Sequence, residues 1–453
     1  MTGDPFHIAP VRGRARIDVL DILRGVAILG IFYMNDPFMG NNANLLQTSA
    51  RLIGWSAADR TVWSTIQMFW EGTQRGLLEY LFGAGAMVLT AKAMDPDGPV
   101  AIADLFYRRN LWLLAFGLID IFLMLWIGDI LHMYALAALL IFPFRKLGVK
   151  ALLAIGLLFS TGMAVSGGVE YASRVQLIAT VQTATAKQAA HQPISKDEQA
   201  ALKDWQKKVD RFKGPDKETR KKAEEEVKAH HGGWPGLATW TYATWFDYMI
   251  TGGGTFLTVL EAFCAMLIGM ALWKMGIIQG QRSKRFYAVL ALAAYGFGMG
   301  ARAIGVSEML TFSPVPKTIW ITAEYARLSV SLGHLALVNL LVQTAAGAKI
   351  LAPFKAAGRT AFSLYFCEQF LGIYVLFAPW GLNLWGVYSW AGLAGIATIV
   401  VAMLLVVSNI WVRYFNNGPL EWLWRSLSYW QRQPFRKTPS AASPPAEPAP
   451  IPA

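Results

Sequence analysis

The stretch "RIDVLDILRGVAILGIFYMN", from Arg16 to Asn35, decides the fold class. It is an apolar segment of membrane-spanning length that carries Asp18, Asp21 and Arg24 at i, i+3 and i+6. On a helix this spacing places the three side chains within an arc of about 120°. A charge near the centre of a bilayer costs about 3 kcal/mol or more, so such residues are expected to face protein. The stretch therefore predicts a membrane helix with one charged face.

Composition supports a membrane protein. The chain has 453 residues, of which 55% are hydrophobic and only 15% charged, with 18 Trp. Soluble domains contain about 25% charged residues. We therefore predict an all-α, polytopic helical membrane protein embedded in a lipid bilayer. Cys264 and Cys367 both lie in apolar segments, which argues against a disulfide scaffold and against a thiolate metal site.

The hydropathy pattern predicts about ten transmembrane helices, of which the fourth is short for a bilayer. Their approximate bounds are Ile17–Met34, Gly72–Ala91, Asn110–Ile127, Ile130–Phe144, Ala151–Val169, Gly254–Lys274, Phe286–Ile304, Ile319–Val342, Thr360–Pro379 and Ala391–Tyr414.

Basic residues cluster at alternate connections between these spans, as the positive-inside rule requires of cytoplasmic loops. The opposite connections are poor in them, with only Lys317 between the seventh and eighth spans. We predict a bacterial inner-membrane protein with both termini in the cytoplasm. The net charge of +12 is then explained by topology, and no nucleic-acid partner is expected. The basic connections are Arg12–Arg16, Lys92–Arg109, Arg145–Lys150, Lys274–Arg285, Lys349–Arg359 and the segment from Arg413 onward.

The chain divides into four predicted regions. Residues 1–169 form an N-terminal half with five helices, and residues 248–430 form a C-terminal half with five more. Residues 431–453 form a Pro/Ala-rich tail that we predict to be disordered. Between the halves, residues 170–247 form a charged extracytoplasmic insert whose pattern suits one or two amphipathic helices. It is predicted to be a solvated helical hairpin or, alternatively, a lid over an outward-facing site. His230 and His231 lack nearby metal ligands at suitable spacing and are predicted to be loop residues, so no metal site is expected.

Two groups of ionisable residues mark the first half of the chain. Glu71, Arg75 and Glu79 stand at i, i+4 and i+8, which makes either a substrate-binding face or an internally neutralised packing face.

Asp129 and His132 stand at i, i+3 at the start of the fourth span, with Asp120 upstream. A carboxylate one turn from a histidine can orient its tautomer and raise its basicity, as a general base needs. The connection at 127–129 is short enough to require an antiparallel hairpin, so we expect Asp120, Asp129 and His132 to line one polar cavity that opens between the third and fourth spans and the first. A hydrogen-bonded helix contact is the alternative for this histidine.

The second half adds further candidate substrate-binding residues within its spans. They are Arg302, Glu324, Arg327, His334 and Glu368.

Five motifs carry a resemblance to the YeiB-type family of bacterial membrane proteins, a family of unknown function. They are "LDILRGVAILGI", "EG..R......LFGAG", "FGLI........GDIL..YAL", "GRTAFSLY" and "GPLEWLWRSLSYW", and they span nearly the whole chain in order. The insert and the tail lie outside the resemblance.

The family is similar in turn to transmembrane acyltransferases, which move an acyl group from a coenzyme A thioester to an acceptor. The resemblance implies that Asp21 and Arg24 belong to a shared first-helix motif. The family usually has histidine where this chain has Asp120, so the role of the base is expected to fall to His132 or Asp120. Arg24 could stabilise developing negative charge or simply neutralise Asp21.

The implied activity is transfer of an acyl group from acyl-CoA to an envelope glycan, lipid or small molecule, with no permanently bound cofactor. Arg108, Arg109 and Arg145 could hold the phosphates of the donor. A transporter or exporter that uses buried acid-base residues, and a non-catalytic envelope protein, are the alternatives.

Overall fold

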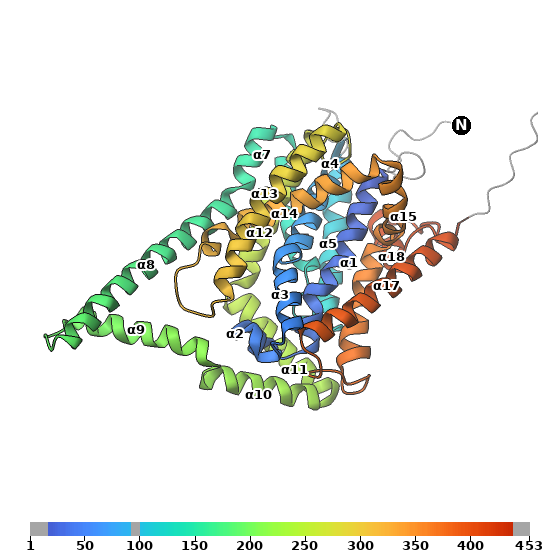
Figure 1. Cartoon of the computed structure of the whole chain (residues 1–453). Coiled ribbons are helices and arrows are strands. Elements are labelled where there is room, and N and C mark those ends of the chain that lie inside the picture. The colour runs from blue at the N-terminus through green and yellow to red at the C-terminus, as the bar shows by residue number, and fades with distance from the viewer. Residues whose placement is uncertain (1–16, 92–99, 438–453) are drawn as a thin grey trace, which may run out of the picture.

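The computed structural model describes residues 17–91 and 100–437, and these residues fold into one helical bundle with a projecting arm (Figure 1). Within this part of the chain the only β pairing is a single bridge between Phe415 and Arg436. The all-α prediction is therefore confirmed. The basic cluster at Arg12–Arg16 and Lys92 lie outside the described residues.

The helices of the N-terminal half differ in length and in continuity. The second predicted span is preceded by a separate helix, α3, which is joined to α4 through Trp70–Gly72. The elements are α1 (Asp18–Gly40), α2 (Ala43–Thr48), the 3-10 turn η2 (Ala50–Ile53), α3 (Ala57–Phe69), α4 (Thr73–Thr90), α5 (Val100–Phe122), α6 (Leu131–Ile141), η4 (Phe142–Lys146) and α7 (Val149–Gly156).

The insert is more helical than predicted. The fifth span continues as one long helix into the insert, and three further helices follow before a π-helical turn. These elements are α8 (Leu158–Ala189), α9 (Lys196–Lys213), α10 (Lys217–His231), α11 (Gly233–Trp245) and η5 (Phe246–Thr251). Ser195 and Glu198 form a capping box that starts α9, and Asp216 caps α10. His230 and His231 therefore lie in the last turn of α10 and not in a loop, which corrects the prediction.

The C-terminal half follows the predicted spans closely, and α12 and α14 have the predicted bounds. The elements are α12 (Gly254–Lys274), α13 (Lys284–Met309), α14 (Ile319–Val342), α15 (Ala345–Arg359), α16 (Ala361–Gln369), the π-helix η6 (Phe370–Phe377), α17 (Trp390–Tyr414) and α18 (Pro419–Tyr429). The basic connection at Lys349–Arg359 is itself a helix, which packs along α1.

Among the described residues, five helices are long and apolar enough to cross a membrane. A sixth is added if α15 and the α16–η6 segment, which meet at a bend of 75°, count as one span. This is fewer than the ten predicted. The predicted spans of the N-terminal half form helices, but α6 has only 11 residues and α1, α4 and α5 carry ionisable side chains. Such helices can lie inside a bundle, because their polar groups then face protein and not lipid.

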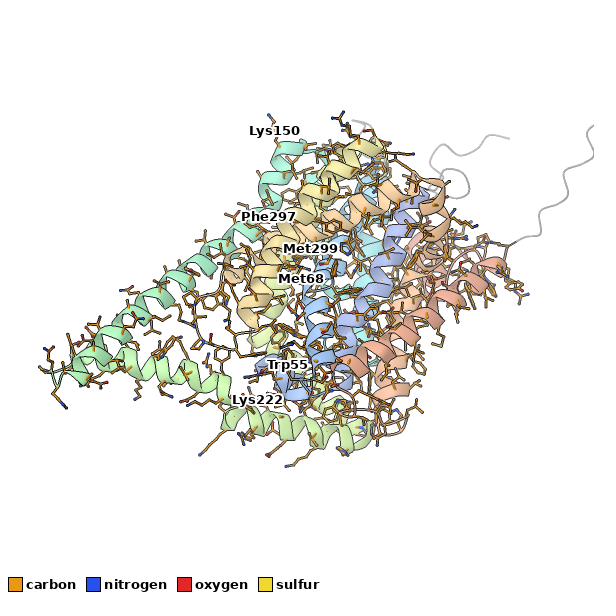
Figure 2. The ribbon with its side chains drawn as sticks, viewed as in Figure 1. Trp55, Met68, Lys150, Lys222, Phe297 and Met299 are labelled. Atoms are coloured by element: carbon orange, nitrogen blue, oxygen red, sulfur yellow. The ribbon has the colours of Figure 1, made fainter. Side chains whose placement is uncertain are left out.

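The two ends of the bundle carry different elements. The start of α7 and the beginnings of α1 and α13 lie at one end, and α2 and α10 lie at the other (Figure 1). Lys150 and Lys222 accordingly mark opposite ends of the molecule in Figure 2. The arm formed by α8 and α9 projects sideways, and α10 returns beneath the bundle.

The start of the predicted disordered tail is ordered. Residues 431–437 pack on the end of α17, where Asn416 and Lys437 donate backbone hydrogen bonds to Phe435 and Tyr414. Trp422 also donates its indole N–H to the carbonyl of Gln433 at 2.7 Å. Residues 438–453 lie outside the described part of the chain.

Candidate functional site

The turn between α5 and α6 holds a buried aspartate–histidine pair. Asp129 Oδ2 lies 2.7 Å from His132 Nδ1. The same carboxylate accepts the backbone N–H groups of Leu131 and His132 at 3.1 and 2.9 Å, which fixes it at the start of α6. Because the carboxylate accepts from Nδ1, the neutral imidazole carries its proton there and presents Nε2 as the basic nitrogen.

Asp120 completes this group from the last turn of α5. It lies beside Asp129 and Tyr365, and it is fully buried. Neither of its carboxyl oxygens has a hydrogen-bond partner within the described part of the chain.

Gly117 explains how α5 and α6 come so close. A Cβ atom at Gly117 would lie 2.8 Å from the Asp129 carboxylate and 2.9 Å from the Cα of His132. No side chain fits that gap. The glycine of the "FGLI" motif is therefore required by the close approach of the two helices.

Tyr365 on α16 contributes a hydroxyl that the sequence reasoning missed. It donates to Asp129 Oδ1 and accepts the backbone N–H of Ile130, both at 3.2 Å. The tyrosine lies in the "GRTAFSLY" motif, so its place in a shared motif was the available signal.

The insert also reaches this site. Trp245, the last residue of α11, packs edge-on against His132 with ring centroids 5.8 Å apart. The indole Nε1 of Trp245 and the Nε2 of His132 are both buried and have no hydrogen-bond partner in the described residues. Sequence reasoning did not single out Trp245, because only tertiary packing brings it to the hairpin.

The structure thus brings Asp120, Asp129 and His132 together as the sequence predicts. All three are buried, with exposed fractions of 0–2%, so the site is closed in this conformation rather than an open cavity. Tyr242, also on α11, donates its hydroxyl to the carbonyl of Phe122 and helps hold the insert over the hairpin.

A second buried group lies between α4, α12 and α14. Arg327 contacts Glu79 at 2.9 Å, Glu261 at 2.8 Å and Glu324 at 3.0 Å. Arg75 contacts the same Glu261 at 2.7 Å. These five residues form what we call the ion cluster.

The ion cluster adjoins α6 on the side away from His132. Tyr134 donates its hydroxyl to the carbonyl of Arg75 at 3.0 Å, and positions 132 and 134 point to nearly opposite faces of a helix. Glu261 was missed by the sequence reasoning, although a lone acid in the apolar run "VLEAFCAML" was a usable signal.

The remaining predicted substrate-binding residues lie apart. Arg302 donates to the carbonyls of Met68 and Glu71 and so caps the end of α3. His334 contacts the carbonyl of Val330 and the hydroxyl of Tyr295. Glu368 is buried on α16, and neither carboxyl oxygen has a hydrogen-bond partner in the described chain.

The predicted first-helix pair is present, but it lies away from His132. Arg24 Nη1 is 2.9 Å from Asp21 Oδ1, with Asp21 buried and the Arg24 side chain 36% exposed. Arg24 lies near Arg109, which stands eleven residues before Asp120 on α5, a distance of about 16 Å along the helix. Arg24 and His132 therefore do not act on one reacting group.

The predicted phosphate-binding arginines share one end of the α5–α6 hairpin, where Phe106 and Tyr107 pack against Phe142. Their guanidinium groups already have contacts. Arg108 pairs with Asp104 at 2.9 Å, Arg109 lies over the ring of Trp424, and Arg145 donates to the carbonyl of Phe142.

Two titratable groups of the insert have altered protonation. Burial lowers the pKa of His230 to about 4, and its ring stacks on Trp385 with centroids 4.2 Å apart. Burial raises the pKa of Glu226, although hydrogen bonds from Ala43 and Asn44 of α2 oppose that rise. Both residues anchor α10 to the bundle. No group of three His, Cys, Asp or Glu residues suited to a metal ion occurs in residues 17–91 and 100–437.

Comparisons with known proteins support the YeiB-type resemblance. Residues 272–431 match the family described as "Protein of unknown function (DUF418)". The chain is 29% identical over 447 residues to the uncharacterized protein YxaH of Bacillus subtilis (strain 168), covering 95% of this chain and 98% of the relative. It is 26% identical over 424 residues to the uncharacterized protein YeiB of Escherichia coli (strain K12), covering 90% and 95%. No solved structure matches the chain. These relatives are not named as acyltransferases.

Proposed function

We propose that this chain is an integral-membrane acyltransferase of the bacterial inner membrane, as the resemblance of the YeiB-type family to transmembrane acyltransferases implies. It moves an acyl group from a coenzyme A thioester to an envelope glycan, lipid or small-molecule acceptor. The transfer takes place at the α5–α6 hairpin, and His132 is the general base.

One observation carries this proposal: Asp129 orients the His132 imidazole at 2.7 Å, and the opposite nitrogen is left without a partner. A buried polar atom without a partner is uncommon and calls for an explanation. A base whose Nδ1 is held by a carboxylate and whose Nε2 is free has the arrangement that general-base catalysis uses.

The proposed reaction uses this arrangement directly. An acceptor hydroxyl or amine gives its proton to His132 Nε2 while its oxygen or nitrogen attacks the thioester carbonyl. The carbon–sulfur bond then breaks, and the thiolate of coenzyme A leaves and takes up the proton from the imidazolium. Trp245 offers an indole N–H beside the histidine, and such a donor can stabilise the negative charge that develops on the carbonyl oxygen.

The donor would approach from the other end of the hairpin. Arg108 and Asp120 are twelve residues apart on α5, which is about 18 Å, a distance that requires a donor with a long extended arm. Arg108, Arg109 and Arg145 would attract its phosphates electrostatically. Arginines on the cytoplasmic side also serve topology and bind anionic lipid.

The test uses the protein purified in detergent or reconstituted in vesicles. Release of free coenzyme A thiol from acyl-CoA is followed colorimetrically in the presence of polyprenyl-linked sugars, lipids or soluble glycans. His132→Ala should abolish acceptor-dependent thiol release and leave the melting temperature nearly unchanged. The matched control is His334→Ala, which removes another intramembrane histidine and should keep activity. Full activity in His132→Ala would rule the proposal out.

A transporter is the second candidate, and the ion cluster favours it. The cluster joins α4, α12 and α14 in the interior, where buried charges often mark a substrate or proton path. The test measures uptake or efflux by reconstituted vesicles. Transport that is lost in Glu261→Gln but kept in His132→Ala would favour this function over acyl transfer.

A further inference from the structure

A pocket of about 120 Å³ lies on the side of the bundle where α1, α3 and the start of α17 meet. Its lining shares no residue with the His132 site or the ion cluster. The lining residues are Tyr33, Met34, Pro37, Phe38, Leu46, Ala50, Trp63, Ile66, Gln67, Glu71 and Trp390. In Figure 2, Trp55 lies near the end that carries α10 and Met68 lies about half-way along the bundle, so α3, which supplies Trp63, Ile66 and Gln67 to the lining, runs between these two levels.

The lining is rich in aromatic rings. Tyr33, Phe38, Trp63 and Trp390 all belong to the lining. The rings are held in place: Trp390 donates its indole N–H to the carbonyl of Ala50 at 2.8 Å, and Tyr33 bonds Thr398 through its hydroxyl at 3.0 Å. Several aromatic faces around one space attract a cation through the ring quadrupole, and such cages recognise quaternary ammonium groups.

A carboxylate completes the pocket. Glu71 lies at the break between α3 and α4, and its carboxylate accepts a hydrogen bond from the Gln67 side chain at 3.3 Å. Arg302 interacts electrostatically with Glu71, and its guanidinium donates to the backbone carbonyls of Met68 and Glu71 and so holds this segment in place. The Glu71 carboxylate is exposed and has capacity for a further donor.

The size of the pocket suits a small cation. An apolar cavity of about 150 Å³ can hold benzene, so a slightly smaller one has room for a trimethylammonium or ethanolammonium group. The pairing of aromatic faces with one carboxylate favours a cation over a neutral or anionic ligand of the same shape.

We propose that this pocket binds the ammonium group of a small organic cation, presented either by a free molecule or by the headgroup of a zwitterionic lipid. Tyr33, Trp63 and Trp390 surround the cation, and Glu71 neutralises it. The site is separate from the one that transfers acyl groups under the proposed function, so the two proposals fail or succeed independently.

The first experiment measures equilibrium binding of radiolabelled choline to the full chain in a maltoside detergent. Unlabelled tetramethylammonium should displace choline, whereas 3,3-dimethylbutan-1-ol, its neutral isostere, should do so at least about ten-fold less well. Equal displacement by the two compounds would overturn the proposal, because shape alone would then explain binding.

Variants locate the site. Glu71→Gln and Trp63→Leu should each weaken choline binding at least about ten-fold, while Trp63→Phe, which keeps an aromatic face, should lose less. Glu224→Gln, on the exposed face of α10, is the matched control and should bind as the parent chain does. Because Trp63 is buried, the melting temperature of each variant is measured as well. Unchanged binding in Glu71→Gln, an exposed position where folding is not at risk, would overturn the proposal.

A second arm separates the two sources of the ammonium group. Choline binding is compared in nanodiscs of phosphatidylglycerol and of phosphatidylethanolamine. Weaker binding in phosphatidylethanolamine would identify the lipid headgroup as the occupant, and equal binding would identify a free cation. Failure to bind in both bilayers and in detergent would overturn the site.

Discussion

Trp245 of the insert packs against the His132 imidazole of the membrane bundle, with ring centroids 5.8 Å apart. The two residues are 113 positions apart in the sequence, and the atoms that face the site from each, the indole Nε1 and the imidazole Nε2, have no hydrogen-bond partner in the described chain. The insert is therefore part of the candidate site, because its last helix, α11, packs against His132. This contact supports the interpretation of the insert as a lid.

The first prediction concerns Asp129. Asp129→Asn keeps the shape of the side chain but replaces the carboxylate that holds His132 Nδ1 at 2.7 Å, so the imidazole is no longer fixed in the tautomer that presents Nε2 to an acceptor. Acyl transfer measured by thiol release should fall by about 10²–10⁴-fold, the range that general-base catalysis contributes. Tyr365→Phe removes only a 3.2 Å hydrogen bond to the same carboxylate and should cost much less. Equal losses in the two variants would argue against a base oriented by Asp129.

Gly117 gives a second prediction. Gly117→Ala places a methyl group within 3 Å of the Asp129 carboxylate and of the His132 backbone, so α5 and α6 must separate. We expect a destabilisation of about 1–3 kcal/mol and loss of activity. Gly85→Ala on α4 is the control, since a Cβ there meets nothing within 4 Å. Thermal unfolding and thiol release of both variants provide the check, and a fully active Gly117→Ala would contradict the packing described here.

The buried and the partly exposed ion pairs should differ. Arg327→Gln leaves three carboxylates of the ion cluster without their shared partner, and breaking a buried pair costs about 3–5 kcal/mol. Arg24→Gln should cost less, because 36% of the Arg24 side chain is exposed and water compensates for the lost contact. For that pair, the double variant Asp21→Asn/Arg24→Gln should be more stable than the worse single variant. Similar melting temperatures for Arg327→Gln and Arg24→Gln would contradict this difference.

The attachment of α10 should depend on pH. Burial lowers the pKa of His230 to about 4, below its ordinary value of about 6.5, so the attached state favours the neutral ring. The buried neutral ring of His230 stabilises the attached state of α10 fully above pH 6.5. This stabilisation is lost as the pH falls from 6.5 towards 4, and by pH 5 the loss is about 2 kcal/mol.

The measurement is limited proteolysis or hydrogen exchange of residues 196–245 at pH 7.5 and pH 5. We expect faster cleavage at pH 5 in the parent chain and little pH dependence in His230→Phe, which keeps the stacking on Trp385 without a titratable group. His231→Phe is the control, because that ring is exposed. The same pH dependence in both variants would assign the effect to another group.

The last prediction concerns topology. In a background where Cys264 and Cys367 are replaced, Ser195→Cys in the insert should react with a membrane-impermeant maleimide added to whole cells. Ser283→Cys, at the start of α13 and at the opposite end of the bundle, should react only after the membrane is permeabilised. The reverse pattern would show that both termini are outside.

The local features of the site follow from the sequence. The i, i+3 spacing of Asp129 and His132 brings these side chains together. The connection that follows Asp120 is longer than the predicted 127–129, because α5 ends at Phe122 and α6 begins at Leu131, and Asp129 lies just before α6 rather than on it. Four helices of the C-terminal half, α12, α13, α14 and α17, were also predictable, because a run of apolar residues of membrane length is a strong signal that needs no tertiary context.

Other parts of the site depend on packing between distant segments. Tyr365, Trp245 and Glu261 come from α16, α11 and α12. Spacing along one helix does not show which residues of another helix it will contact, so the sequence could not place these three. The number of membrane spans was overestimated for a related reason: α1, α4, α5 and α6 have hydrophobic stretches, but hydropathy alone does not distinguish a helix that faces lipid from one that is surrounded by protein.

The sequence by itself determined the helical class, the buried acid-base pair at Asp129 and His132 and the charged insert, because these depend on composition and on spacing within single helices. The tertiary structure decided that Arg327 joins Glu79, Glu261 and Glu324, that Arg24 lies far from His132, and that the insert closes over the hairpin. The physical reason is that burial and partnership of a charge depend on which helix faces it, and only the packed bundle fixes that choice.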